Sequence, residues 1–276
     1  MRQTFNPMAP NLPGAEHHLP SSLSGAVGDT GDSTASTDLS GDGATASHLQ
    51  AGLSRRASLY IRLLALGGAL GPILFTVVVG VCSALRPGYN HLTQLISELG
   101  ATGTSHAAFM NFAGFLPAGL SIAGFGLASV WLIPRSGRSI LAGAMISIFG
   151  LGIAVAGIFH CDPGCPQHGA SLASTIHDRI SVIAFLTCIA GIGLWALHFR
   201  RIATFRSLWK YSAASSVVGL VFLYMVASSL ESRHLTGLWQ RLMLGTLFVW
   251  CMVLARRSFR LRPRFQPANS LRTRSG

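Results

Sequence analysis

Residues 61–85 read IRLLALGGALGPILFTVVVGVCSAL, and the only charged side chain among them is that of Arg62. A helix that crosses the hydrocarbon core of a bilayer, about 30 Å thick, needs about 20 apolar residues. This stretch meets that length, and it exceeds the apolar region of a signal peptide, which has about 7–15 residues. We therefore predict a transmembrane helix here.

Five further apolar stretches follow along the chain. Half of the 276 residues are hydrophobic and 11% are charged, whereas a soluble domain carries about 25% charged residues. We predict an all-α, polytopic membrane protein with a six-helix transmembrane bundle over residues 59–255, in which Ser174 caps the fourth span. The five later spans are predicted at about 107–133, 139–160, 179–198, 211–230 and 237–255.

Small residues recur within two of these spans at the spacing of one helix face. Gly119, Ala123 and Gly126 lie in the second span, and Gly150 and Ala154 lie in the third. Such residues let two helix backbones approach closely in a membrane. We predict that they pack helices together.

Two polar tails flank the predicted bundle. Residues 1–58 are rich in Gly, Ser and Thr, carry five acids and contain few large apolar side chains, so we predict a disordered cytoplasmic tail. Residues 256–276 are rich in Arg, and we predict a basic cytoplasmic tail that lies along anionic lipid. Because the basic residues flank apolar spans, the predicted partner is membrane lipid and not nucleic acid. The sequence names no protein partner.

The distribution of basic residues predicts how the bundle is oriented in the membrane, because every second connection between spans is rich in them. They cluster before the first span, between the second and third, between the fourth and fifth, and after the sixth. Loops rich in Arg and Lys stay in the cytoplasm. We predict that both termini lie inside (N-in, C-in), which puts residues 86–106, 161–178 and 231–236 on the outer side.

The acidic residues that follow the N-terminal tail indicate one face of the membrane. They are Glu98, Asp162, Asp178 and Glu231, and all four fall on the predicted outer side with six of the ten His residues. Ionisable groups at membrane level are costly, so their gathering indicates a functional site. The alternative is that outer loops are polar because they face water, and the sequence leaves both interpretations open.

The first outer loop reads RPGYNHLTQLISELG over residues 86–100. Its apolar residues at positions 92, 95, 96 and 99 recur at helical spacing, Asn90 is a good N-cap, and the following glycine ends the pattern. We predict a short amphipathic helix that lies in the membrane interface, with His91, Gln94 and Glu98 on its polar face.

The second outer loop contains two cysteines and other potential metal ligands. Cys161 and Cys165 can form a disulfide outside the reducing cytosol, bind a metal or stay free thiols. Asp162, His168 and His177 are weak candidates for zinc ligands, because zinc takes such oxygen and nitrogen groups but the spacing matches no standard zinc pattern. The sequence establishes no cofactor.

Arg241 lies one turn inside the sixth predicted span. A charged side chain at this depth should need a partner, and the four acids of the outer side are its candidate ion-pair partners. Snorkelling of the guanidinium to the interface is the alternative.

The outer polar residues support two functional hypotheses. We favour a non-enzymatic binding, sensing or scaffolding bundle, since the chain contains no Walker A, GxSxG or HExxH motif. The alternative is a hydrolase, with or without a metal, that acts on a lipid or amphiphile of the outer leaflet. Its candidate catalytic residues are Asp162 and His177 as an acid–base pair, with Glu98 or Ser97 assisting.

Three segments of the outer side resemble a known family. They are RPGYNHLTQLISELG (86–100), GTSHAAFMNFAGF (103–115) and GIFHCDPG (157–164), the last of which is followed by His177 and Asp178. Together they resemble the bacterial integral membrane family catalogued as domain of unknown function 998.

The resemblance covers roughly residues 60–255 and leaves out both tails. It implies a small, multi-pass helical protein of the bacterial plasma membrane with about six spans, and it implies no activity. The motif-bearing positions that it marks are Ser97, Glu98, Asp162 and His177.

Overall fold

The computed structural model describes the backbone of residues 40–260 and the side chains of residues 56–260. Within these residues every regular element is a helix, and six helices are long and apolar enough to cross a membrane, so the predicted six-span bundle is confirmed. The elements are α1 (Ser40–Leu85), η1 (Ile96–Gly100), α2 (Ala107–Phe109), η2 (Met110–Phe115), α3 (Leu116–Leu132), α4 (Gly137–Ala156), α5 (Leu172–Phe199), η3 (Ala203–Leu208), α6 (Trp209–Ser229) and α7 (Thr236–Phe259).

Both predicted tails fall largely on residues that are not described. Residues 1–39 and 261–276 lie outside the described part of the chain. Residues 40–58, which the sequence assigns to the acidic tail, form the beginning of α1. The described residues from Ala46 onward belong to one compact unit, which holds all six spans.

The fourth span begins earlier than the hydrophobic pattern predicts. Helix α5 starts at Leu172 and is capped by Ser171, whose hydroxyl accepts a hydrogen bond from the backbone N–H of Ser174 at 3.2 Å. The prediction that Ser174 is the cap is therefore wrong by one turn. A hydropathy pattern misses the beginning of α5, because the residues around Asp178 are polar although their backbone is already helical.

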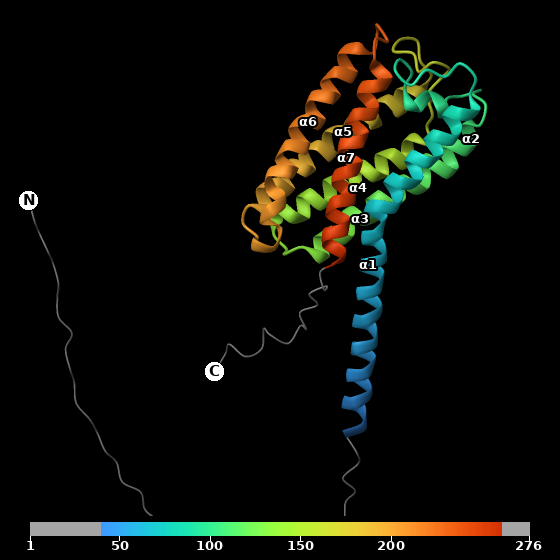
Figure 1. The fold of residues 1–276 in the computed structure, drawn as a ribbon. Coiled ribbons are helices and arrows are strands. Elements are labelled where there is room, and N and C mark those ends of the chain that lie inside the picture. Colours follow the sequence, from blue (N-terminus) through green and yellow to red (C-terminus); the bar gives the residue numbers. More distant parts are fainter. Residues whose placement is uncertain (1–39, 261–276) are drawn as a thin grey trace, which may run out of the picture. The chain divides into compact units, whose positions relative to one another are not determined.

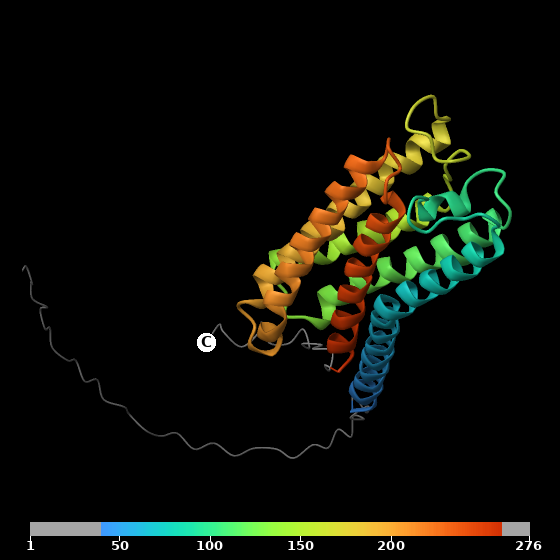
Figure 2. The same cartoon turned by 45° about the horizontal axis from the view of Figure 1, so that its top comes forward.

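Consecutive spans pack against each other, so that α3 to α7 form an antiparallel series (Figure 1). Residues 86–106, 157–171 and 230–235 gather at one end of the bundle, which we call the loop end (Figure 2). The opposite end, which we call the basic end, carries the connections before α4 and α6 and the end of α7. Its basic residues are Arg135, Arg138, Arg200, Arg201, Arg206, Lys210, Arg256, Arg257 and Arg260.

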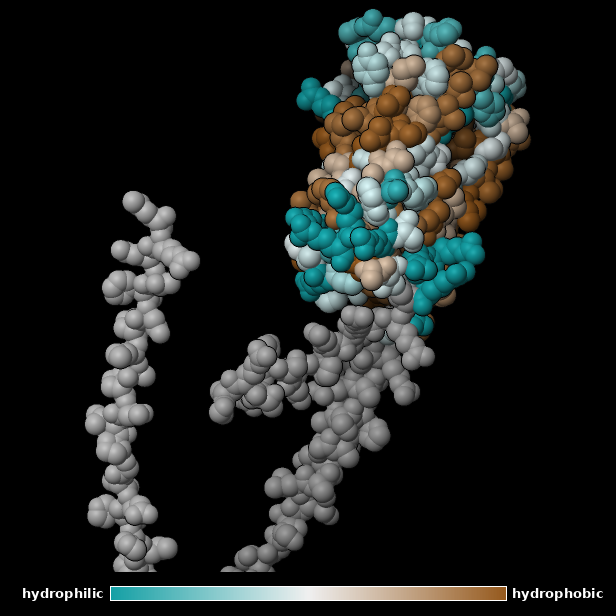
Figure 3. Space-filling view, turned by 60° about the vertical axis from the view of Figure 1, so that its left-hand side comes forward, coloured by the Kyte–Doolittle hydropathy of each residue, from teal (hydrophilic) through white to brown (hydrophobic). Residues whose placement is uncertain are grey.

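The surface has the pattern expected of a membrane protein. In the face shown in Figure 3, hydrophobic side chains form a belt between two hydrophilic ends. Large apolar side chains within the spans, such as those of Leu186, Val217 and Val221, are exposed. In a bilayer they contact lipid tails, which explains why so many apolar residues point outward.

The helices α3 and α4 approach closely through their small residues. A Cβ atom on Gly119 would meet the backbone of Gly150 and Ala154, and one on Gly150 would meet the backbone of Ala123. The predicted packing role of these residues is confirmed. Helix α1 packs on α3 in the same way. A Cβ atom on Gly71 of α1 would lie 2.8 Å from the backbone carbonyl oxygen of Ala118 in α3.

This packing predicts a large difference between two glycine substitutions. Gly150→Ala should destabilise the protein by about 1–3 kcal/mol, because the added methyl group overpacks a backbone contact. Gly245→Ala is the matched control, since a Cβ at this position in α7 meets nothing within 4 Å and alanine favours the helix. Unfolding of both variants in detergent measures the difference, and equal stability would contradict the packing.

Candidate functional site

The first loop of the loop end forms a buried turn where an interfacial helix is predicted. Residues 96–100 make a short 3₁₀ helix, η1, and all five are buried. Its apolar residues Ile96 and Leu99 pack into the main core of the bundle, and the side chain of Leu95 packs beside Cys161. Of the four predicted apolar positions, 95, 96 and 99 are buried, but against the protein, whereas Leu92 is 49% exposed and the helix has only five residues.

Glu98 is the most connected side chain of this turn. It is 4% exposed. Its carboxylate accepts hydrogen bonds from the backbone N–H of Leu95 at 3.0 Å and from Nε2 of Gln94 at 3.0 Å, and it forms an ion pair with Arg233 at 3.2 Å. A buried charge needs such partners, because leaving it unpaired costs several kcal/mol. Glu98, predicted as a candidate catalytic residue, is therefore committed to holding the loop.

Arg233 joins all three loops of the loop end. Beyond Glu98 in the first loop, its guanidinium donates to the backbone carbonyls of Gly164 at 2.7 Å and Cys165 at 2.8 Å in the second loop. Its own backbone is left-handed, with φ of 56°. A non-glycine residue holds this conformation at a cost of about 1–3 kcal/mol, and only where its surroundings compensate.

Three further hydrogen bonds fix η1 to the helices. The N–H of Ile96 donates to Oε1 of Gln240 in α7 at 2.7 Å, and Nδ2 of Asn111 donates to the carbonyl of Gly100 at 2.9 Å. Asn111 lies in η2, a π-helical segment of the second span. Arg86 donates to the carbonyl of Glu98 at 2.7 Å.

Arg241 binds neutral oxygens rather than a carboxylate. Its guanidinium donates to Tyr89 Oη at 2.6 Å, to the carbonyl of Gln94 at 3.0 Å and to that of Gly237 at 2.8 Å. Within the described residues no acid lies within 4 Å of it, so the expected ion pair is not seen, and Glu98 pairs with Arg233 instead. Burial raises the pKa of Tyr89, which keeps this phenol protonated, and it donates to the carbonyl of Leu95 at 2.9 Å.

The two cysteines of the second loop are joined to each other. Cys161 and Cys165 form a disulfide, one of the three states that the sequence leaves open. Both are buried beside Ser97, whose Oγ lies 3.5 Å from Sγ of Cys165. The disulfide therefore packs directly on η1.

Asp162 closes the second loop onto helix α5. Its carboxylate accepts hydrogen bonds from the backbone N–H of Ser171 at 2.7 Å and from the Ser171 hydroxyl at 2.8 Å. These two bonds lower the pKa of Asp162 below its ordinary value of 3.8. The residue that caps α5 is thus itself held by Asp162.

The predicted zinc ligands are not brought together. Among residues 56–260 no group of three His, Cys, Asp or Glu side chains has the arrangement of a metal site. Asp162 binds Ser171, His168 lies exposed on the loop, and His177 is buried in α5. This geometry lends the zinc prediction no support.

The ring of His177 is held through Nδ1. Its Nδ1 lies 2.8 Å from the carbonyl of Phe159 and 3.1 Å from that of Ala156. Carbonyl oxygens only accept, so Nδ1 carries a proton and donates to them.

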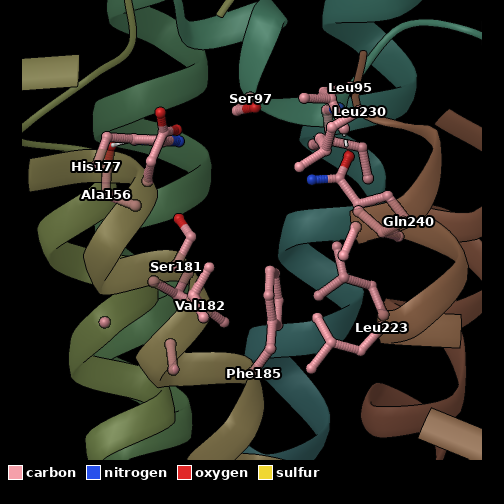
Figure 4. A pocket seen from close by; sticks show the side chains of 18 of the residues that line it. Leu95, Ser97, Ala156, His177, Ser181, Val182, Phe185, Leu223, Leu230 and Gln240 are labelled. Atoms are coloured by element: carbon pink, nitrogen blue, oxygen red, sulfur yellow. Dashed lines mark hydrogen bonds between the residues drawn. The ribbon is translucent and has the colours of Figure 1, made fainter. Parts of the chain in front are cut away.

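A cavity of about 160 Å³ lies below η1, between the halves of the helices that are nearer the loop end (Figure 4). Its deeper wall is apolar and includes Phe115, Phe185 and Leu223. Its polar end is formed by Ser97 of η1, by His177, Asp178 and Ser181 of α5, by Gln167 of the second loop and by Gln240 of α7. An apolar cavity of about 150 Å³ is large enough to bind a molecule such as benzene.

The cavity reaches the surface between α5 and α6. Among its lining residues, Val182 of α5 is 51% exposed, and Ala227 of α6 and Gln167 of the second loop are exposed as well. Val182 and Ala227 belong to neighbouring spans that pack on each other. The exposed part of the lining therefore lies on the apolar spans as well as on the second loop.

The structure unites some predicted site residues and separates others. Ser97 and His177 both line the cavity, whereas Glu98 and Asp162 hold the loops. Sequence reasoning did not single out Arg233 or Gln240. The sequence does mark Arg233 as one of the few basic residues on the side that holds the four acids. It does not mark Gln240, because the role of this residue depends on a hydrogen bond with Ile96, 144 residues away.

The Glu98 network predicts that this acid is structural. Glu98→Ala should lower the free energy of unfolding by roughly 1–3 kcal/mol, because Arg233 and the Leu95 N–H lose their acceptor. Glu231→Ala is the control, since Glu231 is exposed in the third loop. Chemical unfolding in detergent measures both variants, and an unchanged Glu98→Ala protein would contradict the network.

The Asp162 bonds predict a dependence of stability on pH. Since the pKa of Asp162 is lowered in the folded protein, its stabilisation is present above pH 3.8 and is lost as pH falls through the folded-state pKa. Asp162→Asn should therefore melt at a lower temperature than the wild type at pH 6, and the difference should shrink below pH 3.8. Melting curves from neutral to acid pH measure this, with Glu231→Gln as the control.

Comparison with known proteins identifies one family. The family described as "Protein of unknown function (DUF998)" matches residues 69–257. No curated protein and no solved structure matches the chain. The matched region contains η1, the disulfide and all the residues that line the cavity.

Proposed function

The chain belongs to the DUF998 family, whose activity is unknown, and we propose a function from its cavity. We propose that this multi-pass membrane protein binds an amphiphile. The part of the hydrocarbon tail next to the head occupies the apolar part of the cavity, and the rest extends between α5 and α6 into the bilayer. The polar head lies under η1, at Ser97, His177 and Gln240.

The polarity of the cavity is the observation that supports this proposal most directly. Hydrogen-bonding side chains lie at one end of a wall that is otherwise apolar (Figure 4). Ligand sites generally combine an apolar lining with a few placed polar groups. The opening between α5 and α6 faces the region where lipid tails lie, so the ligand is one that the bilayer dissolves.

Binding explains the site better than hydrolysis does. Two of the four candidate catalytic residues, Glu98 and Asp162, have carboxylates engaged in loop contacts. In the described part of the chain no hydrogen bond joins His177 to Ser97, so a nucleophile and a base are not paired. The rigid loop end suits a binding or sensing role, with the disulfide and Arg233 holding the cover of the cavity in place.

The proposal includes an orientation and a location. The basic end lies in the cytoplasm of a bacterial cell and the loop end faces outward across the plasma membrane. The cluster of basic residues at one end supports this orientation. A disulfide at the loop end suits the same orientation, because disulfides persist outside the reducing cytosol.

Filling the cavity tests the proposed function. Val226→Phe places a ring in the cavity, since Val226 is a buried lining residue of α6. Val221→Phe is the matched control on the same helix, where the valine is 52% exposed and does not line the cavity. We expect Val226→Phe to lose at least tenfold in affinity for a dodecyl amphiphile, and Val221→Phe to bind as the wild type does.

The measurement is calorimetric titration of the full-length protein in phosphatidylcholine nanodiscs. Thermal unfolding of each variant shows whether it is folded. Equal binding by wild type and Val226→Phe would contradict the proposal, because the ligand would then partition into lipid only. Release of a cleaved product from an ester amphiphile would indicate the hydrolase instead.

A further inference from the structure

We infer that the head group bound in the cavity is a primary ammonium, held by the carboxylate of Asp178 with Nε2 of His177 as a second acceptor. This inference rests on the proposed function and names the ligand class for the same site. The ligand is a long-chain amine whose charged end lies at the outer half of α5.

Asp178 is the charged group of the cavity wall. No Lys or Arg is among the residues that line the cavity, and the other lining side chains are apolar or neutral polar groups. Within the described residues Asp178 forms no ion pair, and no hydrogen bond reaches its carboxylate. A half-buried carboxylate at the edge of a membrane is costly without a cation, and a bound ammonium supplies one.

The nearest candidate cation on the protein is already engaged. Arg233 forms an ion pair with Glu98, and two carbonyls of the second loop occupy the rest of its guanidinium. Its position is fixed by these three partners from two loops. Within the described residues no ion pair joins it to the carboxylate of Asp178.

His177 adds an acceptor beside this charge. Its Nδ1 proton is committed to the carbonyls of Phe159 and Ala156. We infer that the bound ligand meets the neutral form of the ring, in which Nε2 accepts an N–H. The hydroxyls of Ser97 and Ser181 can accept as well. A primary ammonium has three N–H donors, which matches a site with more acceptors than donors.

Gln240 contributes the one fixed donor of the polar end. The N–H of Ile96 donates to its Oε1, so this atom is the amide oxygen and Nε2 is the donor left for the cavity (Figure 4). It can donate to an oxygen of the ligand. An anionic head such as a fatty acid does not suit the site, because its charge would face that of Asp178.

Three dodecyl compounds test the head group. Full-length protein in phosphatidylcholine nanodiscs is titrated at pH 7 with dodecylamine, dodecan-1-ol or dodecyltrimethylammonium, and binding by Val226→Phe is subtracted as partition into lipid. We expect dodecylamine to bind the wild type roughly tenfold to hundredfold more tightly than the alcohol, the range of a charge-assisted hydrogen bond. Asp178→Asn should remove this preference, and Glu231→Gln should keep it.

The outcomes separate the two proposals. Equal affinity for dodecylamine and the alcohol in the wild type overturns the ammonium inference and leaves the cavity as a site for neutral amphiphiles. Equal affinity for dodecylamine and the trimethylammonium compound overturns it too, because the latter has no N–H to donate. If no compound binds wild type better than Val226→Phe, the proposed function fails as well. The first two comparisons need only wild type and Val226→Phe, so they hold even if Asp178→Asn does not fold.

Discussion

The burial of the Glu98 carboxylate is the constraint on which the loop end depends. A charge that is 4% exposed must be matched by donors, and here they come from its own turn and from the third loop through Arg233. Arg233 in turn binds the carbonyls of the second loop, where the disulfide packs against Ser97. One ion pair thus orders three loops that are distant in sequence, at the cost of a left-handed backbone at Arg233.

The cavity is a consequence of this arrangement. Because η1 is held by the bonds of its own Glu98 and by Gln240 of α7, it covers the space between the helices without filling it. The disulfide and the Asp162–Ser171 bonds keep the second loop against the start of α5, which carries His177 and Asp178. The structural acids and the cavity residues therefore have separate tasks within one polar cluster.

Much of the fold could be predicted because a bilayer imposes its constraint locally. Each span had to be long and apolar by itself, so six helices could be recognised without knowing their neighbours. The packing role of the small residues of α3 and α4 could also be predicted, since close packing of two helices requires small residues at helical spacing. The loops were harder: the apolar pattern around Ile96 was recognised, but whether it faces lipid or protein depends on what surrounds it.

By itself the sequence determined the number and position of the spans, the basic and acidic asymmetry of the two ends, and the gathering of polar residues on one side. Only the tertiary structure decided which acid pairs with which base, since Glu98 lies 135 residues from Arg233 and no local pattern links them. It also decided that His177 and Asp178 line a cavity whereas Asp162 does not. The physical reason is that hydropathy and helical spacing act over one turn or one span, whereas a buried charge selects its partner across the whole bundle.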